Sequence, residues 1–162
     1  MREGDRRLEW KFYFANMALC AANRATCPKI KVGAVLVKDQ EVISTGYNGA
    51  PKGMKHCFDV GCIIDKNGHC IRSVHAEANA IMRAARDTRG AELFCTHMPC
   101  IECCKLIMNA EIKKVYYIFD YYDKRVADLG FADQTEFLKE GKIEVERIDV
   151  RYLSKDARMC AY

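Results

Sequence analysis

The chain has 162 residues, half of them hydrophobic and a tenth aromatic, and a formal net charge of +4. This length and composition allow one domain with a buried core. The small positive excess is spread along the chain and is too weak to indicate a nucleic-acid partner, and no stretch approaches the roughly 18 apolar residues that span a bilayer.

The first part of the chain predicts a helix followed by a hairpin. Residues 8–25 carry apolar side chains at near-helical spacing, with Pro28 just beyond them, which predicts a buried helix. Two β-branched runs, 32–37 and 41–47, are separated by polar residues and predict an antiparallel pair. Residues 48–72 hold four glycines, one proline and little periodicity, so we expect a long loop that is functional or pinned by something other than a core.

The second part alternates regularly. Helices are predicted at 75–86, 100–109 and over much of 124–139, with Gly141 as the stop, and strands at 93–96, 115–119 and 143–148. Alternating helices and strands with short links predict parallel pairing and helices on both faces of the sheet. The expected fold is therefore a three-layer α/β/α sandwich with a mixed five-stranded sheet. We expect one domain over residues 1–162, with its core at about 8–148 and a C-terminal tail at 149–162.

Ten cysteines would indicate a disulfide framework in a short secreted protein. Here several lie at CxxC-like spacing or beside histidines, which favours metal binding in a reducing cytoplasm. The apolar run from Phe12 to Ala22 is not interpreted as a signal peptide, because Glu9 and Lys11 crowd its start and Asn16 interrupts it. We expect a soluble, cytoplasmic protein.

Two short motifs give the strongest chemical signal: His-Ala-Glu at 75–77 and Pro-Cys-Ile-Glu-Cys at 99–103. Each opens a predicted helix. Cysteines three apart at a helix start project toward one point, and the positive helix end favours their thiolates. His75, Cys100 and Cys103 thus supply three protein ligands and leave the fourth position of a tetrahedral zinc open to water, as in catalytic sites.

Glu77 lies two residues from a ligand and is expected to transfer protons from a zinc-activated water to the substrate ring and the leaving amine. His-x-Glu with a later Pro-Cys-x-x-Cys is the known signature of zinc deaminases. The alternative is that the cysteines are buried thiols and His75 a core histidine, as Cys104 is expected to be a core thiol. Two motifs in this order favour the metal site.

Five segments together resemble the deoxycytidylate (dCMP) deaminases of the bacterial and phage type: 31–35 (KVGAV), 46–51 (GYNGAP), 68–72 (GHCIR), 75–81 (HAEANAI) and 99–103 (PCIEC). The resemblance covers about residues 8–148. It implies a cytidine deaminase-like fold, hydrolysis of dCMP to dUMP and ammonia, and a supply of dUMP for thymidylate synthesis. It also implies a homo-oligomer, commonly a hexamer, activated by dCTP with magnesium and inhibited by dTTP.

The resemblance also implies roles for single residues. Asn48 matches an asparagine near the sugar and phosphate, Asn79 is expected to act similarly, and Tyr122 matches an aromatic residue against the pyrimidine. Arg86 matches an arginine near the effector and subunit interface. Each has a structural alternative: Asn48 shapes a turn, Tyr122 packs, and Arg86 is a solvated side chain.

A second zinc is implied at four residues in and before the long loop: Cys27, Cys57, His69 and Cys70. Four protein ligands would close the coordination shell and stabilise a segment poor in apolar residues. His56 and Cys62 stay open as alternatives for the fourth ligand.

Some features of the sequence leave the substrate open. Ala78 replaces a larger apolar residue usual in the family, and His97 and Met98 lie at a variable approach to the second motif. The phosphate-binding cation is not identified, although Arg24, Lys29 and Lys31 are candidates. The competing hypotheses are another zinc deaminase, acting on a nucleoside or on tRNA adenosine, and a non-catalytic zinc scaffold, whose usual sign is loss of the acid that Glu77 supplies.

Overall fold

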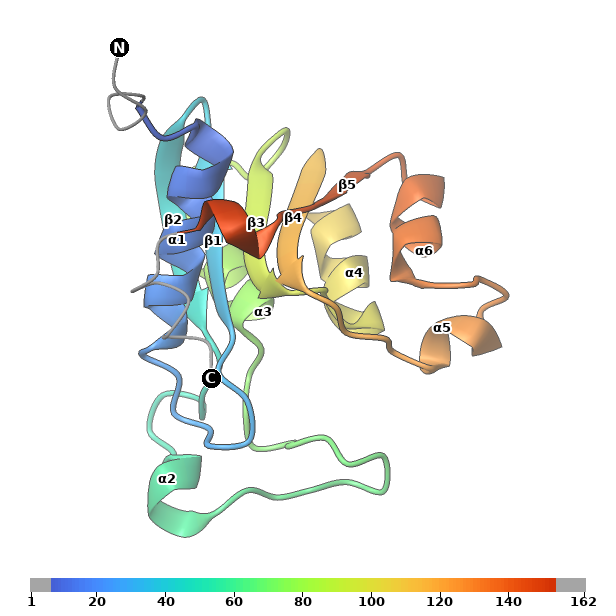
Figure 1. Ribbon diagram of the computed structural model, residues 1–162. Helices are drawn as coiled ribbons and strands as arrows, with labels where there is room; N and C mark the ends of the chain where they lie inside the picture. The colour runs from blue at the N-terminus through green and yellow to red at the C-terminus, as the bar shows by residue number, and fades with distance from the viewer. Residues whose placement is uncertain (1–6, 154–162) are drawn as a thin grey trace.

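A computed structural model describes residues 7–153 and contains a five-stranded sheet in the order β2-β1-β3-β4-β5 (Figure 1). The strands are β1 (Gly33–Lys38), β2 (Glu41–Tyr47), β3 (Glu92–His97), β4 (Lys114–Phe119) and β5 (Glu144–Arg147). β1 pairs antiparallel with both β2 and β3, whereas β3, β4 and β5 run parallel. The predicted mixed sheet that begins with a hairpin is confirmed.

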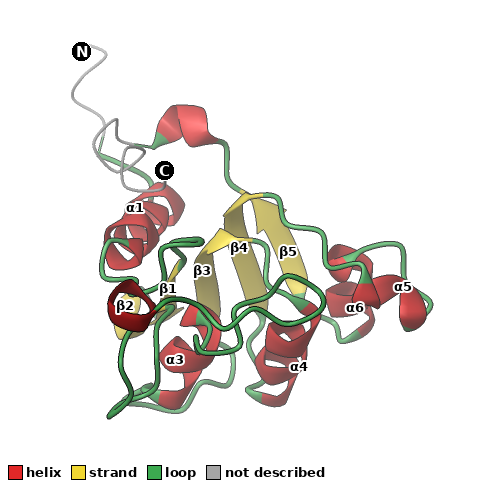
Figure 2. Ribbon diagram, turned by 90° about the horizontal axis from the view of Figure 1, so that it is seen from below, coloured by secondary structure: helices red, strands yellow, loops and turns green. Residues whose placement is uncertain are grey.

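Helices cover both faces of the sheet. They are α1 (Trp10–Ala22), α2 (Cys57–Val60), α3 (Ala76–Met82), α4 (Ile101–Asn109), α5 (Arg125–Asp128), α6 (Gln134–Glu140) and the 3-10 helix η1 (Val150–Tyr152). Figure 2 shows α1 on one side of the sheet and α3 and α4 on the other, which confirms the three-layer sandwich. Among the helices of residues 7–153, none is long and apolar enough to cross a membrane.

Alternate residues of the central strands belong to the two layers of the core. On β1, Ala34 and Leu36 pack in the cluster shared with α3 and α4, while Val35 and Val37 pack in the cluster shared with α1. Successive side chains of a strand point to opposite faces, and both faces are covered here. A continuous apolar run in the sequence is the expected result.

Two predicted helices differ from the observed ones. The helix predicted over 124–139 is divided into α5 and α6, because Gly130 adopts a positive φ of 85° that ends the first, and Asp133 caps the second by accepting from the Glu136 N–H. The helix predicted over 75–86 ends at Met82. Of the predicted tail, residues 154–162 lie outside the described part of the chain.

The long loop of residues 48–72 is confirmed as mostly irregular, with the single turn α2 inside it (Figure 1). Two isolated bridges, Gly49 to Val74 and Ile64 to Cys70, tie its parts together. The loop leads directly into α3, so its path determines how that helix approaches the sheet.

Gly46 lets α3 lie directly on β2. A Cβ at this position would overlap the carbonyl oxygen of Ala76 and lie 2.6 Å from the backbone nitrogen of Ala80. Both atoms belong to the α3 backbone, which cannot move aside as a side chain can. The helix that begins next to His75 is therefore seated by backbone contact.

We predict that Gly46→Ala lowers the free energy of unfolding by about 3 kcal/mol, because the added methyl group overpacks a backbone contact. Urea unfolding measures this value. Thr45→Ala is the matched control, since Thr45 is exposed on the same strand and its loss should cost under about 1 kcal/mol. Equal costs for the two variants would show that the contact with α3 is not tight.

Candidate metal centre and active site

The two motifs lie at the starts of α3 and α4, as predicted. His75 is the N-cap residue of α3 and Cys100 that of α4, while Cys103 lies in the first turn of α4. β3 and β4 are parallel, so both end at the same edge of the sheet, and α4 follows β3 there. This edge is where α/β proteins ordinarily bind ligands.

The side chains of His75, Cys100 and Cys103 meet there. The Nδ1 atom of His75 lies 3.3 Å from the Cys100 sulfur and 3.4 Å from the Cys103 sulfur, and all three ligand atoms lie within 4.8 Å of one another. Both cysteines are buried, whereas His75 is exposed. The structure thus brings together the three ligands that the sequence predicted.

The charges in this cluster are coupled. A hydrogen bond from the Cys103 thiol, together with the nearby imidazole, lowers the pKa of Cys100 to about 4. The hydrogen bond with Cys100 raises the pKa of His75 to about 9. A metal cation bound here would replace protons of this cluster, because its ligands are thiolates and a neutral imidazole.

The donor set fits zinc. With Zn–S and Zn–N bonds of about 2.3 and 2.0 Å, a tetrahedral ion separates its sulfur and nitrogen ligands by roughly 3.5 Å. The two observed separations are 3.3 and 3.4 Å. A zinc ion held by these three residues would keep one coordination position that none of them fills.

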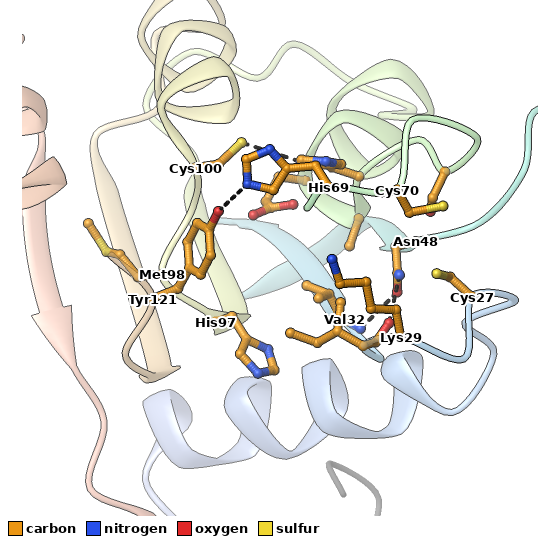
Figure 3. A pocket seen from close by; sticks show the side chains of 15 residues that line it. Cys27, Lys29, Val32, Asn48, His69, Cys70, His97, Met98, Cys100 and Tyr121 are labelled. Atoms are coloured by element: carbon orange, nitrogen blue, oxygen red, sulfur yellow. Dashed lines mark hydrogen bonds between the residues drawn. The ribbon is translucent and has the colours of Figure 1, made fainter. Parts of the chain in front are cut away.

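A cavity of about 250 Å³ lies beside the three ligands (Figure 3). Its lining includes His75, Cys100 and the carboxylate residue Glu77. Glu77 is buried, and this burial raises its pKa, with a further contribution from the neighbouring Cys100 sulfur. A carboxyl group whose affinity for protons is raised thus faces the same space as the metal ligands.

The two predicted substrate asparagines have different positions. Asn48 lines the cavity, and its amide accepts from the Val32 N–H and donates to the Ile30 carbonyl, both at 2.8 Å. Asn79 lies outside the lining and donates to the Tyr47 carbonyl, which ties α3 to β2. Two residues along a helix turn the side chain by about 200° away from Glu77, so the substrate role of Asn79 stays a prediction without support from the cavity lining.

Of the two consecutive tyrosines after β4, the one that lines the cavity is not the predicted Tyr122. Tyr122 is 58% exposed and lies outside the cavity lining, whereas Tyr121 lines it. Both follow the end of β4, where the chain no longer alternates regularly, and consecutive tyrosines offer no sequence signal that separates them. Arg86 lies beyond the end of α3 and forms an ion pair with Glu41 at 2.6 Å, away from the cavity.

Four cysteines form a second cluster. Cys27, Cys57, Cys62 and Cys70 bring their sulfurs within 4.8 Å of one another, so Cys62 occupies the place that His69 was expected to take. His69 instead points into the cavity, where its Nε2 atom lies 3.1 Å from the Tyr121 hydroxyl. Adjacent residues in an extended segment point in opposite directions. Because Cys70 faces the cluster, His69 faces away from it.

The second donor set also fits zinc. Its close sulfur pairs are 3.5 Å (Cys27 and Cys62) and 3.6 Å (Cys57 and Cys70) apart, near the roughly 3.8 Å expected between sulfurs of a tetrahedral zinc and far above the about 2.05 Å of a disulfide. Burial raises the pKa of Cys57 to about 12. Burial of Cys70 is outweighed by backbone N–H groups of Arg72 and Ser73 and by neighbouring thiols, which lower its pKa to about 7.

Sequence reasoning missed a buried polar group behind the first cluster. Asp123 accepts from the Ile101 N–H at 3.0 Å and from Arg125 at 2.7 Å, and so caps the start of α4. Burial would raise the pKa of Asp123, but these hydrogen bonds lower it to about 2. The buried Gln134 donates to the carbonyls of Pro99 and Tyr121.

Asp123 and Gln134 were difficult to identify from the sequence. An acidic residue just after a parallel strand is a reasonable candidate for the ligand-binding edge, which could have marked Asp123. A glutamine at a helix start is ordinarily exposed, so no sequence pattern indicated that Gln134 is buried. Together they hold the segments on either side of Cys100.

Comparisons with known proteins agree with this geometry. The protein-family model described as "Cytidine and deoxycytidylate deaminase zinc-binding region" matches residues 8–119. The chain is 39% identical over 155 residues to ComE operon protein 2 of Bacillus subtilis, covering 94% of this chain and 78% of that protein. It is 42% identical over 122 residues to the deoxycytidylate deaminase of Mycobacterium phage D29, covering 68% of this chain and 95% of that protein.

A solved structure is similar over most of the chain. The dCMP deaminase of the cyanophage S-TIM5, in complex with dCMP and dUMP, matches with a TM-score of 0.71 at 31% identity, covering 88% of this chain and 99% of that one. The chain spans 39% of the length of the deoxycytidylate deaminase of Saccharomyces cerevisiae.

We predict that Asp123→Ala lowers the free energy of unfolding by about 2 to 4 kcal/mol at pH 7, because Arg125 and the α4 cap lose a buried partner. The folded pKa of about 2 lies below an unfolded value of about 4. The stabilisation is therefore complete above pH 4 and is lost as the pH falls toward 2. Urea unfolding at pH 7 and pH 3 measures the difference between the two proteins.

Asp120→Ala is the matched control. Asp120 is 64% exposed and pairs with Arg147 at the surface, so its removal should cost under about 1 kcal/mol. A cost for Asp123→Ala no larger than that of the control would contradict the capping role.

Proposed function

Because this chain belongs to the family of the cytidine and deoxycytidylate deaminase zinc-binding region, we propose that it hydrolyses dCMP to dUMP and ammonia. The observation that carries the proposal is the shared cavity, in which Glu77 and the ligands His75 and Cys100 face one space. The choice of dCMP is supported by the names of relatives, above all the phage D29 enzyme and the cyanophage enzyme bound to dCMP and dUMP.

The reaction adds water to the ring carbon that bears the amino group and releases that group as ammonia. His75, Cys100 and Cys103 would hold a zinc ion, which when bound would make a water readily deprotonated. Glu77 would take the first proton of that water on a carboxylate oxygen and pass it to the ring nitrogen, and would then take the proton of the added hydroxyl group and pass it to the departing amine. Water is consumed, the carbon–nitrogen bond breaks, and no oxidant or reductant is needed.

Two cavity residues are suited to the rest of the nucleotide. The ring of Tyr121 takes the place expected for Tyr122 against the pyrimidine, a contact worth about 1 to 3 kcal/mol. Lys29 lines the cavity, whereas Arg24 and Lys31 lie outside its lining. Lys29 is therefore our candidate for the phosphate of dCMP. We expect Asn48 to fix the wall through its bonds to residues 30 and 32.

We also propose a second, structural zinc in the four-cysteine cluster. Its support is the closeness of the four sulfurs and the lack of a hydrophobic core in the loop that carries three of them. A closed shell of four protein ligands leaves no position for water, so this ion would stabilise and not react. Cys62 replaces His69 in the ligand set that we propose.

Regulation and assembly stay predictions from the family resemblance. They comprise activation by dCTP with magnesium, inhibition by dTTP, a role of Arg86 near the effector, a homo-oligomer such as a hexamer, a cytoplasmic location and supply of dUMP for thymidylate synthesis. Following dCMP turnover with and without dCTP and dTTP, while the oligomer mass is measured, tests the first two together with assembly.

We predict that the purified chain deaminates dCMP in preference to CMP, deoxycytidine and tRNA, assayed side by side by ammonia release. Glu77→Gln should lower kcat by about 1,000-fold because the proton carrier is lost, while the zinc content is unchanged. Preference for deoxycytidine or tRNA would overturn the choice of substrate, and an active Glu77→Gln protein would remove Glu77 from proton transfer.

Glu102→Gln is the control for this variant. Glu102 lies between the two cysteine ligands in sequence, but its side chain is 59% exposed and pairs with Lys105. Glu102→Gln makes the same chemical change as Glu77→Gln beside the same cluster, but at a side chain that does not face the cavity. Its turnover should stay within about twofold of the unmodified protein, since surface ion pairs contribute little.

We predict two zinc ions per chain by elemental analysis. Cys62→Ser should lower the count to one, because three remaining ligands hold a structural ion much more weakly. His69→Ala should keep both ions, since its ring bonds Tyr121 instead. One zinc in the unmodified protein would defeat the second site, and loss of an ion in His69→Ala would restore His69 as its fourth ligand.

A further inference from the structure

One wall of the cavity is formed by the long loop, which has little core of its own. Apolar side chains such as Phe58, Ile64 and Ile71 are exposed along it. A segment with few buried apolar contacts opens easily, so its order depends on specific polar or metal contacts. One such contact crosses the cavity, from His69 of the loop to Tyr121 after β4.

His69 is oriented from the loop side. One oxygen of Asp65 accepts the backbone N–H groups of Asn67 at 2.9 Å and of His69 at 2.8 Å. The other oxygen lies 3.8 Å from the Nδ1 atom of the His69 ring. Asp65 thus holds the backbone of His69 from the loop side, with its second oxygen near the ring.

Tyr121 is oriented from the sheet side. Its carbonyl accepts from the buried Gln134 at 2.7 Å, and the same amide reaches the carbonyl of Pro99, next to the ligand Cys100. Its hydroxyl forms a hydrogen bond of 3.1 Å with Nε2 of His69 (Figure 3). The bond therefore joins the loop to a part of the protein that is already fixed beside the metal ligands.

We propose that His69 and Tyr121 are positioning residues whose hydrogen bond holds the loop segment 63–72 in place as a wall of the substrate cavity. A wall ordered before binding reduces the entropy lost when substrate binds. Loss of the bond should therefore raise KM and leave the chemical step nearly unchanged. The kinetic part of this inference rests on the proposed function, whereas the ordering of the loop does not.

The test combines kinetics with a double-mutant cycle. Tyr121→Phe removes the hydroxyl and keeps the ring, and His69→Ala removes the imidazole partner. Each single variant should raise KM for dCMP by about 3- to 10-fold, as expected for one hydrogen bond, with kcat within about twofold. The double variant should match the singles, because both changes delete the same bond. Tyr122→Phe, at the exposed neighbour, should have no effect.

Hydrogen exchange of the backbone amides in residues 63–72, measured without substrate, gives a readout independent of activity. It should become faster in Tyr121→Phe and in His69→Ala, and not in Tyr122→Phe. Unchanged exchange would overturn the proposal whatever the kinetics, as would KM effects that multiply in the double variant. If the unmodified chain does not deaminate dCMP, the proposed function fails and the exchange measurement alone decides this inference.

Discussion

The candidate active site depends on the meeting of two helix starts. His75 caps α3 and Cys100 caps α4, and the imidazole nitrogen lies 3.3 Å from the sulfur. Both helices direct their positive ends at this point, which favours the thiolate that a metal needs. The parallel arrangement of β3 and β4 makes the meeting geometrically simple, since the strand ends and the start of α4 share one edge. The cavity lined by His75, Cys100 and Glu77 lies beside it.

The loop before α3 has little hydrophobic core. Many of its apolar side chains are exposed, and the four cysteine sulfurs lie within 4.8 Å of one another there, where we propose that a zinc ion takes the place of a hydrophobic core. Cys27 and Cys70 belong to that cluster and also line the cavity. The element that orders the loop and the element that shapes the substrate wall are therefore partly the same side chains.

The sequence predicted the features that depend on period and short spacing: the hairpin, the alternating elements and the three ligands at two helix starts. Features that depend on the direction of a side chain in an irregular segment were not predictable. Two examples are Tyr121, which lines the cavity in place of Tyr122, and Cys62, which joins the sulfur cluster in place of His69. No periodicity governs the loop or the end of β4. The break at Gly130 was missed because one glycine within a helical pattern does not by itself predict an interruption.

The contact between Gly46 and α3 has a consequence for precision at the metal ligands. Main-chain atoms meet there without an intervening side chain, so no change of rotamer can absorb an error in spacing. His75 immediately precedes Ala76, the residue in contact, so a displacement of the start of α3 relative to the sheet also moves the backbone of His75. The backbone position of this candidate ligand is thus determined by main-chain packing.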